Sequence, residues 1–137
     1  DRAAWSTLGY SAGGWCSALV TVRHPQIWSS SVNLAGYFAP MYSPGQQWKT
    51  ADPAAYDLAS VVRRDTPDVR LWFFSGGEDT VSVNAVHGFA PAVSAPTSLE
   101  TNISQSGAHR VALWEAQLDS SLAWLGRTSP AFAPLPA

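Results

Sequence analysis

The sequence predicts an α/β fold in which parallel strands alternate with helices. Short apolar, β-prone runs alternate along the chain with segments whose apolar residues recur at helical spacing, in the order β-α-β-α-β-α-β-α. Elements that alternate in this way form a parallel sheet with right-handed crossovers and helices on both faces. The clearest strand, residues 69–74, is apolar on both faces, as interior strands of such sheets are. We therefore expect about four parallel strands with flanking helices, a three-layer αβα arrangement.

The composition is that of a globular chain. Its 137 residues are 46% hydrophobic and 13% charged, which is enough apolar material to bury a core. The net charge of −2 gives no basic field for nucleic acid or an anionic membrane. Cys16 is the single cysteine, so an internal disulfide and a cysteine-based zinc site are excluded, and we expect it to be a small buried side chain. No apolar run reaches the length of about 18 residues that spans a membrane.

The first strand, residues 5–10, leads into a helix that starts near Gly13. Three apolar residues are expected on one buried face of this helix: Trp15, Leu19 and Val22. The helix should end at His24, because the residue before a proline is disfavoured in the α conformation. The next strand is expected over residues 30–37.

A loop rich in proline and glycine follows, over residues 38–49. Asp52 is a favourable N-cap and Pro53 fits the first helical position, so a helix should begin there and end near Arg64.

The second half of the chain is expected to add a short helix over residues 83–90 and a weaker strand over 97–103. A last helix should bury one face, formed by Trp114, Leu118, Leu122 and Leu125. Residues 127–137 are rich in proline and alanine and are expected to form a loose tail, which leaves residues 1–126 as the folded part.

A G-x-S-x-G pattern, Gly9-Tyr10-Ser11-Ala12-Gly13, lies where the first strand turns into the first helix. A sharp strand-to-helix turn strains the residue at the bend and leaves room only for small residues beside it. Ser11 would then stand at the positive end of the helix, with the Ala12 amide facing a developing oxyanion. The pattern arises by chance in roughly one chain in twenty of this length, so its place between a strand and a helix is what makes it informative.

Three residues of one catalytic mechanism follow predicted strands. Ser11, Asp79 and His109 each come directly after a strand, and the carboxyl ends of parallel strands meet at the rim where active sites lie. A serine hydroxyl becomes a nucleophile when an imidazole accepts its proton, and a carboxylate on the other ring nitrogen fixes the tautomer. Glu78 is an alternative acid. Asp79 is favoured because of its Gly-x-x-Asp spacing and because a shorter side chain suits a tight loop.

Plainer interpretations stay open at this point. Ser11 could only cap a helix, and His109 could lie in a surface loop. His24 and His87 lie within or beside helices and are assigned to structure or solvent. Five aromatic residues could line a substrate cleft or pack in the core: Tyr10, Tyr37, Phe38, Tyr42 and Trp48.

On these residues the chain resembles the α/β-hydrolase fold, and within it the esterases that include esterase D-like enzymes, feruloyl esterases and the antigen 85 mycolyltransferases. The serine, acid and histidine occur in the chain order of that fold. The matching segments are Gly9 to Gly14, Arg23-His24-Pro25, Gly76-x-x-Asp79, and Gly107-Ala108-His109 with Trp114 five residues on. The resemblance covers residues 1–126 and only the C-terminal half of the family's fold.

The resemblance implies a serine esterase that acts on a small-molecule ester and needs no metal or organic cofactor. Acyl transfer to an alcohol by the same residues, or an inactive fragment, are the alternatives. It also implies that the N-terminal half of the fold lies outside these residues. The free edge of the strand over residues 5–10 would then be covered by that half or by a second copy of the chain. A secreted or cell-envelope location is favoured by the resemblance only.

Overall fold

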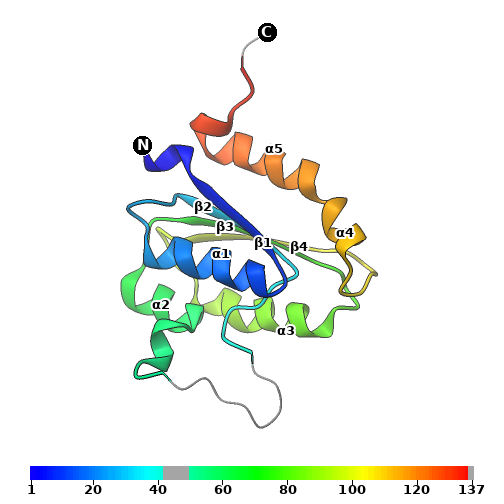
Figure 1. Ribbon diagram of the computed structural model, residues 1–137, viewed down its shortest axis with the longest axis horizontal. Helices are drawn as coiled ribbons and strands as arrows, with labels where there is room; N and C mark the ends of the chain where they lie inside the picture. The colour runs from blue at the N-terminus through cyan, green and yellow to red at the C-terminus, as the bar shows by residue number, and fades with distance from the viewer. Residues whose placement is uncertain (42–49, 136–137) are drawn as a thin grey trace.

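The computed structural model describes residues 1–41 and 50–135, and its centre is one parallel sheet. The four strands are β1 (Ser6–Tyr10), β2 (Ser30–Leu34), β3 (Arg70–Ser75) and β4 (Ser98–Ile103). They lie side by side in chain order, β1-β2-β3-β4, and every neighbouring pair is parallel (Figure 1). The expected parallel sheet is confirmed.

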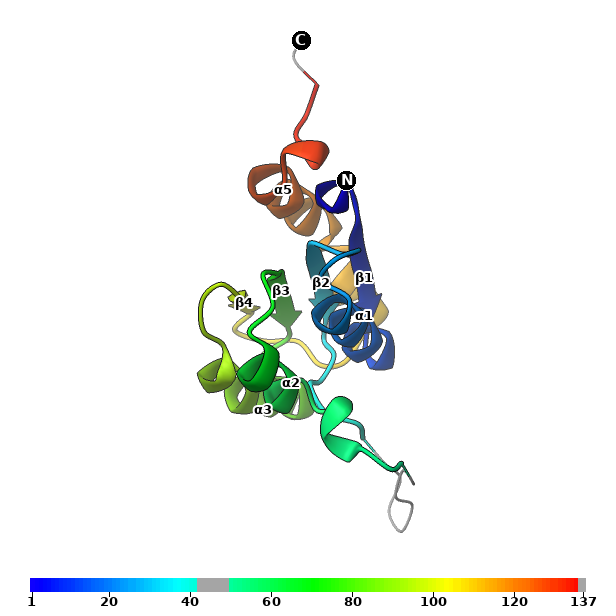
Figure 2. The ribbon, with the colours of Figure 1, turned by 90° about the vertical axis from the view of Figure 1, so that its left-hand side faces the viewer.

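Helices cover both faces of this sheet (Figures 1 and 2). The helices α1 (Ala12–Arg23), α2 (Leu58–Asp65) and α3 (Thr80–Phe89) lie on one face. The other face carries α5 (Leu118–Thr128), which follows the short α4 (Val111–Glu115). The expected three-layer arrangement is therefore confirmed. Four short 3-10 helices complete the described elements: η1 (Arg2–Ala4), η2 (Pro53–Ala55), η3 (Ala90–Ala92) and η4 (Pro130–Phe132).

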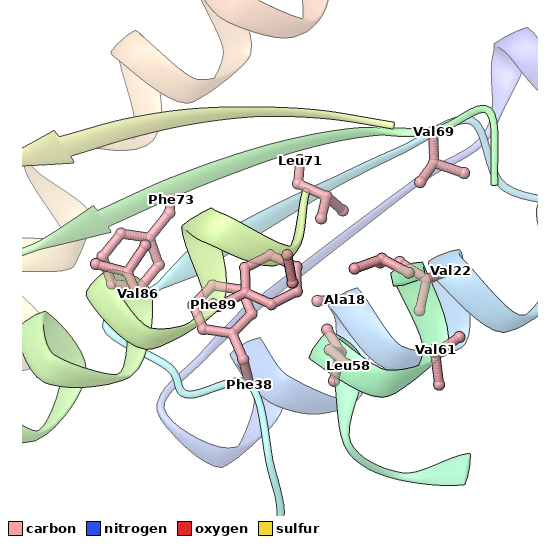
Figure 3. Close-up of a cluster of buried hydrophobic side chains, with 12 residues drawn as sticks. Ala18, Val22, Phe38, Leu58, Val61, Val69, Leu71, Phe73, Val86 and Phe89 are labelled. Atoms are coloured by element: carbon pink, nitrogen blue, oxygen red, sulfur yellow. The ribbon is translucent and has the colours of Figure 1, made fainter. Parts of the chain in front are cut away.

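The alternation of side chains along β3 divides the core into two parts. Leu71 and Phe73 point into the cluster beneath α1, α2 and α3 (Figure 3), and Trp72 and Phe74 belong to the cluster beneath α5. All four side chains are at most 3% exposed. Burying side chains of this size stabilises the fold by roughly 1.5–3 kcal/mol each. Because its side chains alternate between the two clusters, β3 joins the two helical layers.

The helix α1 lies close to the sheet because its buried face is made of small residues. That face consists of Gly14, Ser17, Ala18, Thr21 and Val22. Thr7 of β1 donates to the Ser17 carbonyl at 3.0 Å, and its hydroxyl lies 2.8 Å from that of Thr21. The expected face was therefore wrong in part: Trp15 and Leu19 are only half-buried, because the close approach of helix and sheet favours small side chains beneath them.

Cys16 is exposed, so the prediction of a buried cysteine was wrong. It belongs to α1 but is not among the small residues of this helix that face the sheet. The helical periodicity of the large apolar residues therefore predicted the wrong buried face, because small residues form most of it.

The helix expected from Asp52 to Arg64 is in fact two elements. Asp52 caps only the short η2, where its side chain accepts from the amide of Ala55. The chain then restarts at Asp57, whose side chain accepts from the amide of Ala59 and begins α2. The amide of Leu58 donates to the Phe38 carbonyl at 2.8 Å, so a tertiary contact fixes the start of α2.

The last helix is also divided. A break at Ala116 and Gln117 separates α4 from α5 and turns the buried face, which is formed by Trp114, Ser121, Trp124 and Leu125. Leu118 is 38% exposed and Leu122 is 57% exposed, contrary to the expected face. Beyond α5, the hydroxyl of buried Ser129 donates to the Ala3 carbonyl at 2.5 Å, which ties the first residues after Arg127 to the start of the chain.

Two surface properties bear on partners. In this sheet β1 is an edge strand, and its Leu8 and Tyr10 are 48% and 50% exposed. Trp5, which directly precedes β1, is 57% exposed. Within residues 1–41 and 50–135, no helix combines the length and the hydrophobicity that a bilayer crossing requires.

Candidate active site

Ser11 lies at the bend between β1 and α1 in a strained backbone conformation, with φ 53° and ψ −126°. Positive φ is rare for residues other than glycine and is retained where the surrounding structure enforces it. The amide of Ser11 donates to the Leu34 carbonyl at 2.9 Å, which ties the bend to the end of β2. A Cβ at Gly9 would lie 2.1 Å from the Gly13 carbonyl oxygen, so only glycine fits there. Ala12 is the first residue of α1, directly after the bend.

His109 connects Ser11 to a carboxylate. Its Nε2 lies 2.8 Å from the Ser11 hydroxyl oxygen, and its Nδ1 lies 2.5 Å from Oδ2 of Asp79. These three residues come from the segments after β1, β3 and β4, so the structure brings them together at the carboxyl ends of the strands. The Asp79 side chain is 5% exposed and that of His109 is 44% exposed. The carboxylate is thus shielded, while the imidazole faces the surface beside the serine.

The second carboxylate oxygen of Asp79 is occupied by α3. Oδ1 accepts from the amide of Ser82 at 3.2 Å, so Asp79 is the N-cap of that helix. The hydroxyl of Ser82 in turn donates to the Ala35 carbonyl at 2.8 Å. One oxygen therefore faces the helix and the other faces the imidazole.

Glu78 does not contact the imidazole. Its Oε2 accepts from the amide of Gly107 at 3.2 Å, and its own amide donates to the Gly107 carbonyl at 3.0 Å. Of the two neighbouring carboxylates, Asp79 is the one within hydrogen-bond distance of a His109 ring nitrogen.

Two aromatic rings lie beside the imidazole. Trp114 of α4 contacts His109 edge to face, with ring centroids 4.8 Å apart and an interplanar angle of 76°. Tyr10 lies against the same indole at 4.5 Å. Tyr10 is thus a neighbour of the site, on the side of the exposed β1 edge.

A pocket of about 240 Å³ opens over the serine and the imidazole. It is lined by Ser11, Tyr37, Met41, Asp79, Val81, Ser82 and His109. Burial raises the pKa of Tyr37, with a smaller contribution from Cys16, so its phenol keeps its proton at neutral pH and can donate a hydrogen bond. A neighbouring pocket of about 300 Å³ shares Tyr37 and Met41 with the first.

The other expected cleft residues divide between surface and core. Phe38 is 4% exposed and stacks on Phe89 at 4.1 Å, so most of its ring belongs to the core, although it also borders the neighbouring pocket. Tyr42 and Trp48 lie outside the described residues. His24 and His87 are exposed at the end of α1 and on α3.

Sequence reasoning missed three residues that line the pocket. Ser82 could have been found, because it stands three residues after Asp79, the spacing at which an N-cap meets the helix amides. Met41 and Val81 carry no comparable pattern. No group of three or more His, Cys, Asp or Glu side chains gathers as a metal site within the part of the chain that the structure describes.

Comparisons with known proteins identify the fold. No protein-family model and no curated protein sequence matches the chain. A ferulic acid esterase matches with a TM-score of 0.74 at 14% identity, over 97% of this chain and 54% of that one. An S-formylglutathione hydrolase from Agrobacterium tumefaciens matches with a TM-score of 0.72 at 18% identity, over 91% of this chain and 49% of that one. An acetyl ester-xyloside bifunctional hydrolase from Caldicellulosiruptor lactoaceticus matches with a TM-score of 0.63 at 16% identity, over 88% of this chain and 52% of that one.

The chain spans about half the length of these solved structures. They are α/β-hydrolase esterases, and the match to each extends over nearly all of this chain. The described strands, helices and strand-to-helix bend therefore form part of an α/β-hydrolase fold.

Proposed function

We propose that this chain carries the catalytic residues of a serine esterase. The observation that carries the proposal is the continuous series of hydrogen bonds from the Ser11 hydroxyl through both ring nitrogens of His109 to Asp79. Each residue lies where the chemistry requires it, since the hydroxyl is within reach of a base and the base is oriented by a buried carboxylate.

In the acylation step, the Ser11 oxygen attacks the ester carbonyl carbon while its proton passes to Nε2 of His109. The tetrahedral intermediate collapses, the bond to the leaving alcohol breaks, and the imidazolium returns its proton to that alcohol. A water molecule then attacks the acyl-enzyme, with His109 again as the base, and releases the acid and the free serine. Asp79 stabilises the imidazolium that forms in both steps.

The negative charge on the carbonyl oxygen needs donors at the bend. We assign one of them to the amide of Ala12, at the N-terminus of α1. We propose that the second donor comes from a segment outside this chain, as the family resemblance implies.

The pocket supports a small-molecule ester with an uncharged, partly apolar group next to the carbonyl. Its walls include Tyr37, Met41 and Val81, and the described residues that line it include no lysine or arginine to bind an anion. Tyr37 supplies a phenol beside the nucleophile, where it can donate to a polar atom of the substrate.

We also propose that the exposed edge of β1 is covered in the natural protein. An edge strand with apolar side chains exposes amides and carbonyls that readily pair with another strand. The remaining half of the fold, or a second copy of this chain, would complete the pairing.

The nucleophile is tested with a fluorophosphonate probe on the natural protein that carries this chain. We expect labelling at Ser11 and hydrolysis of p-nitrophenyl acetate, with activity falling at acidic pH because a protonated imidazole cannot accept the serine proton. Ser11→Ala should remove both labelling and hydrolysis. Ser94→Ala, which changes an exposed serine in the loop before β4, should preserve both. Labelling that persists in Ser11→Ala contradicts the assignment.

A further inference from the structure

The segment that carries His109 is held to the end of β3 by a pair of hydrogen bonds to one glycine. Both bonds are made by Glu78: its amide donates to the Gly107 carbonyl at 3.0 Å, and its carboxylate accepts from the Gly107 amide at 3.2 Å. We propose that Glu78 is a positioning residue that holds His109 at Ser11 through the backbone of Gly107. This inference rests on the proposed function and adds a residue to it.

The backbone around this pair leaves little room for adjustment. A Cβ at Gly76 would lie 2.1 Å from the Gly107 carbonyl oxygen, and one at Gly77 would lie 2.4 Å from the Ser104 carbonyl oxygen. The segment after β4 therefore rests directly on the backbone of residues 76 and 77. Gly107 itself has φ +103°, a conformation in which residues other than glycine are strained.

Other contacts support this segment at its two ends. The amide of Ser104 donates to the Ser75 carbonyl at 3.1 Å near its start. Towards its end, only Ala108 separates Gly107 from His109, so a displacement of Gly107 is passed on to the imidazole. Trp114 contacts the ring from one side, and its buried indole N–H has no hydrogen-bond partner among the described residues. Leu113 packs against Gly107, and the Glu78 pair holds both backbone polar groups of Gly107 next to the base.

The length of the Glu78 side chain and its acceptor oxygen, rather than its charge, determine its role. Nδ1 of His109 is already occupied by Asp79, and the Glu78 carboxylate binds a backbone amide instead of the ring. Glutamine retains an oxygen at the same distance from the backbone and can accept the same hydrogen bond. Aspartate retains the charge but is shorter by one methylene, so its carboxylate falls short of Gly107.

The test compares Glu78→Gln, Glu78→Asp and Glu78→Ala in the natural protein that carries this chain. Glu115→Ala, which removes an exposed carboxylate from α4, is the matched control. With p-nitrophenyl acetate we expect kcat to fall about 10- to 100-fold in the aspartate and alanine variants, with KM little changed. The glutamine and control variants should stay within about threefold of the unmodified protein.

A second readout does not depend on ester hydrolysis. We expect the proton between His109 and Asp79 to give a low-field NMR resonance that broadens in Glu78→Ala and Glu78→Asp and remains sharp in Glu78→Gln. Thermal unfolding checks that each variant is folded; if alanine is not tolerated, the glutamine and aspartate pair decides alone. Equal losses in glutamine and aspartate would show a role for the charge, and an unchanged resonance and kcat in Glu78→Asp would show no positioning role. Either result overturns the proposal. Absence of hydrolysis in the unmodified protein would instead refute the esterase function. The NMR resonance alone would then test whether Glu78 positions His109.

Discussion

Replacing Asp79 by asparagine should stop His109 from acting as a base, and the structure indicates why. One carboxylate oxygen accepts from the amide of Ser82, and the other faces Nδ1 of His109. An asparagine keeps the contact with Ser82 only by pointing its single oxygen at the helix. Its NH₂ group then faces Nδ1, which must become the acceptor. The ring proton moves to Nε2, so the imidazole donates to Ser11 and can no longer take its proton.

The expected magnitude is a fall in kcat of about 10³–10⁴-fold, as for the equivalent change in a serine protease. That fall corresponds to about 4–5.5 kcal/mol of lost transition-state stabilisation. The assay is steady-state hydrolysis of p-nitrophenyl acetate by the natural protein that carries this chain. Glu78→Gln is the control, because it alters the neighbouring carboxylate while keeping an acceptor for Gly107, and it should lower kcat by no more than about threefold. A larger loss in Glu78→Gln than in Asp79→Asn would refute the reasoning and assign the acid to Glu78.

Two further predictions concern the bend and the sheet edge. Gly9→Ala should cost about 2 kcal/mol or more of stability, because its Cβ would overlap the Gly13 carbonyl, whereas Gly13→Ala meets open space and should be tolerated; urea denaturation compares them. The isolated chain, residues 1–137, should associate in gel filtration and hydrolyse esters at least about 10²-fold more slowly than the natural protein, if the second oxyanion donor lies outside it as we propose. A fully active monomer would contradict both expectations.

The sequence predicted the sheet and the site better than it predicted the helices. The strands are buried runs in a fixed order, and the residues directly after them must meet at one rim whatever the details of the loops. Ser11, Asp79 and His109 therefore came together as expected. Tyr37 was expected as one of several aromatic residues that could line a cleft, and it does border the pocket.

The helices departed from expectation where tertiary contacts decide. Periodicity marked Leu118 and Leu122 as buried, yet a break before α5 turns them outward. The start of α2 depends on a hydrogen bond to Phe38, twenty residues before it in the chain. Neither the break before α5 nor the hydrogen bond to Phe38 is indicated by a local pattern in the sequence. The role of Glu78 was hidden for the same reason, since its partner is 29 residues away.

The chain-order arrangement of the strands sets a distance that the catalytic loops must cross. Neighbouring strands lie about 4.8 Å apart, so β4 is roughly 14 Å from β1, and the segment after β4 must return over the ends of β3 and β2 to reach Ser11. Directly after β2 the chain turns at Ala35, which has φ 51° and is fully buried. The six residues from 104 to 109 thus act as a span of set length. Because this distance is fixed, a residue added to the segment or removed from it would move the imidazole away from the nucleophile.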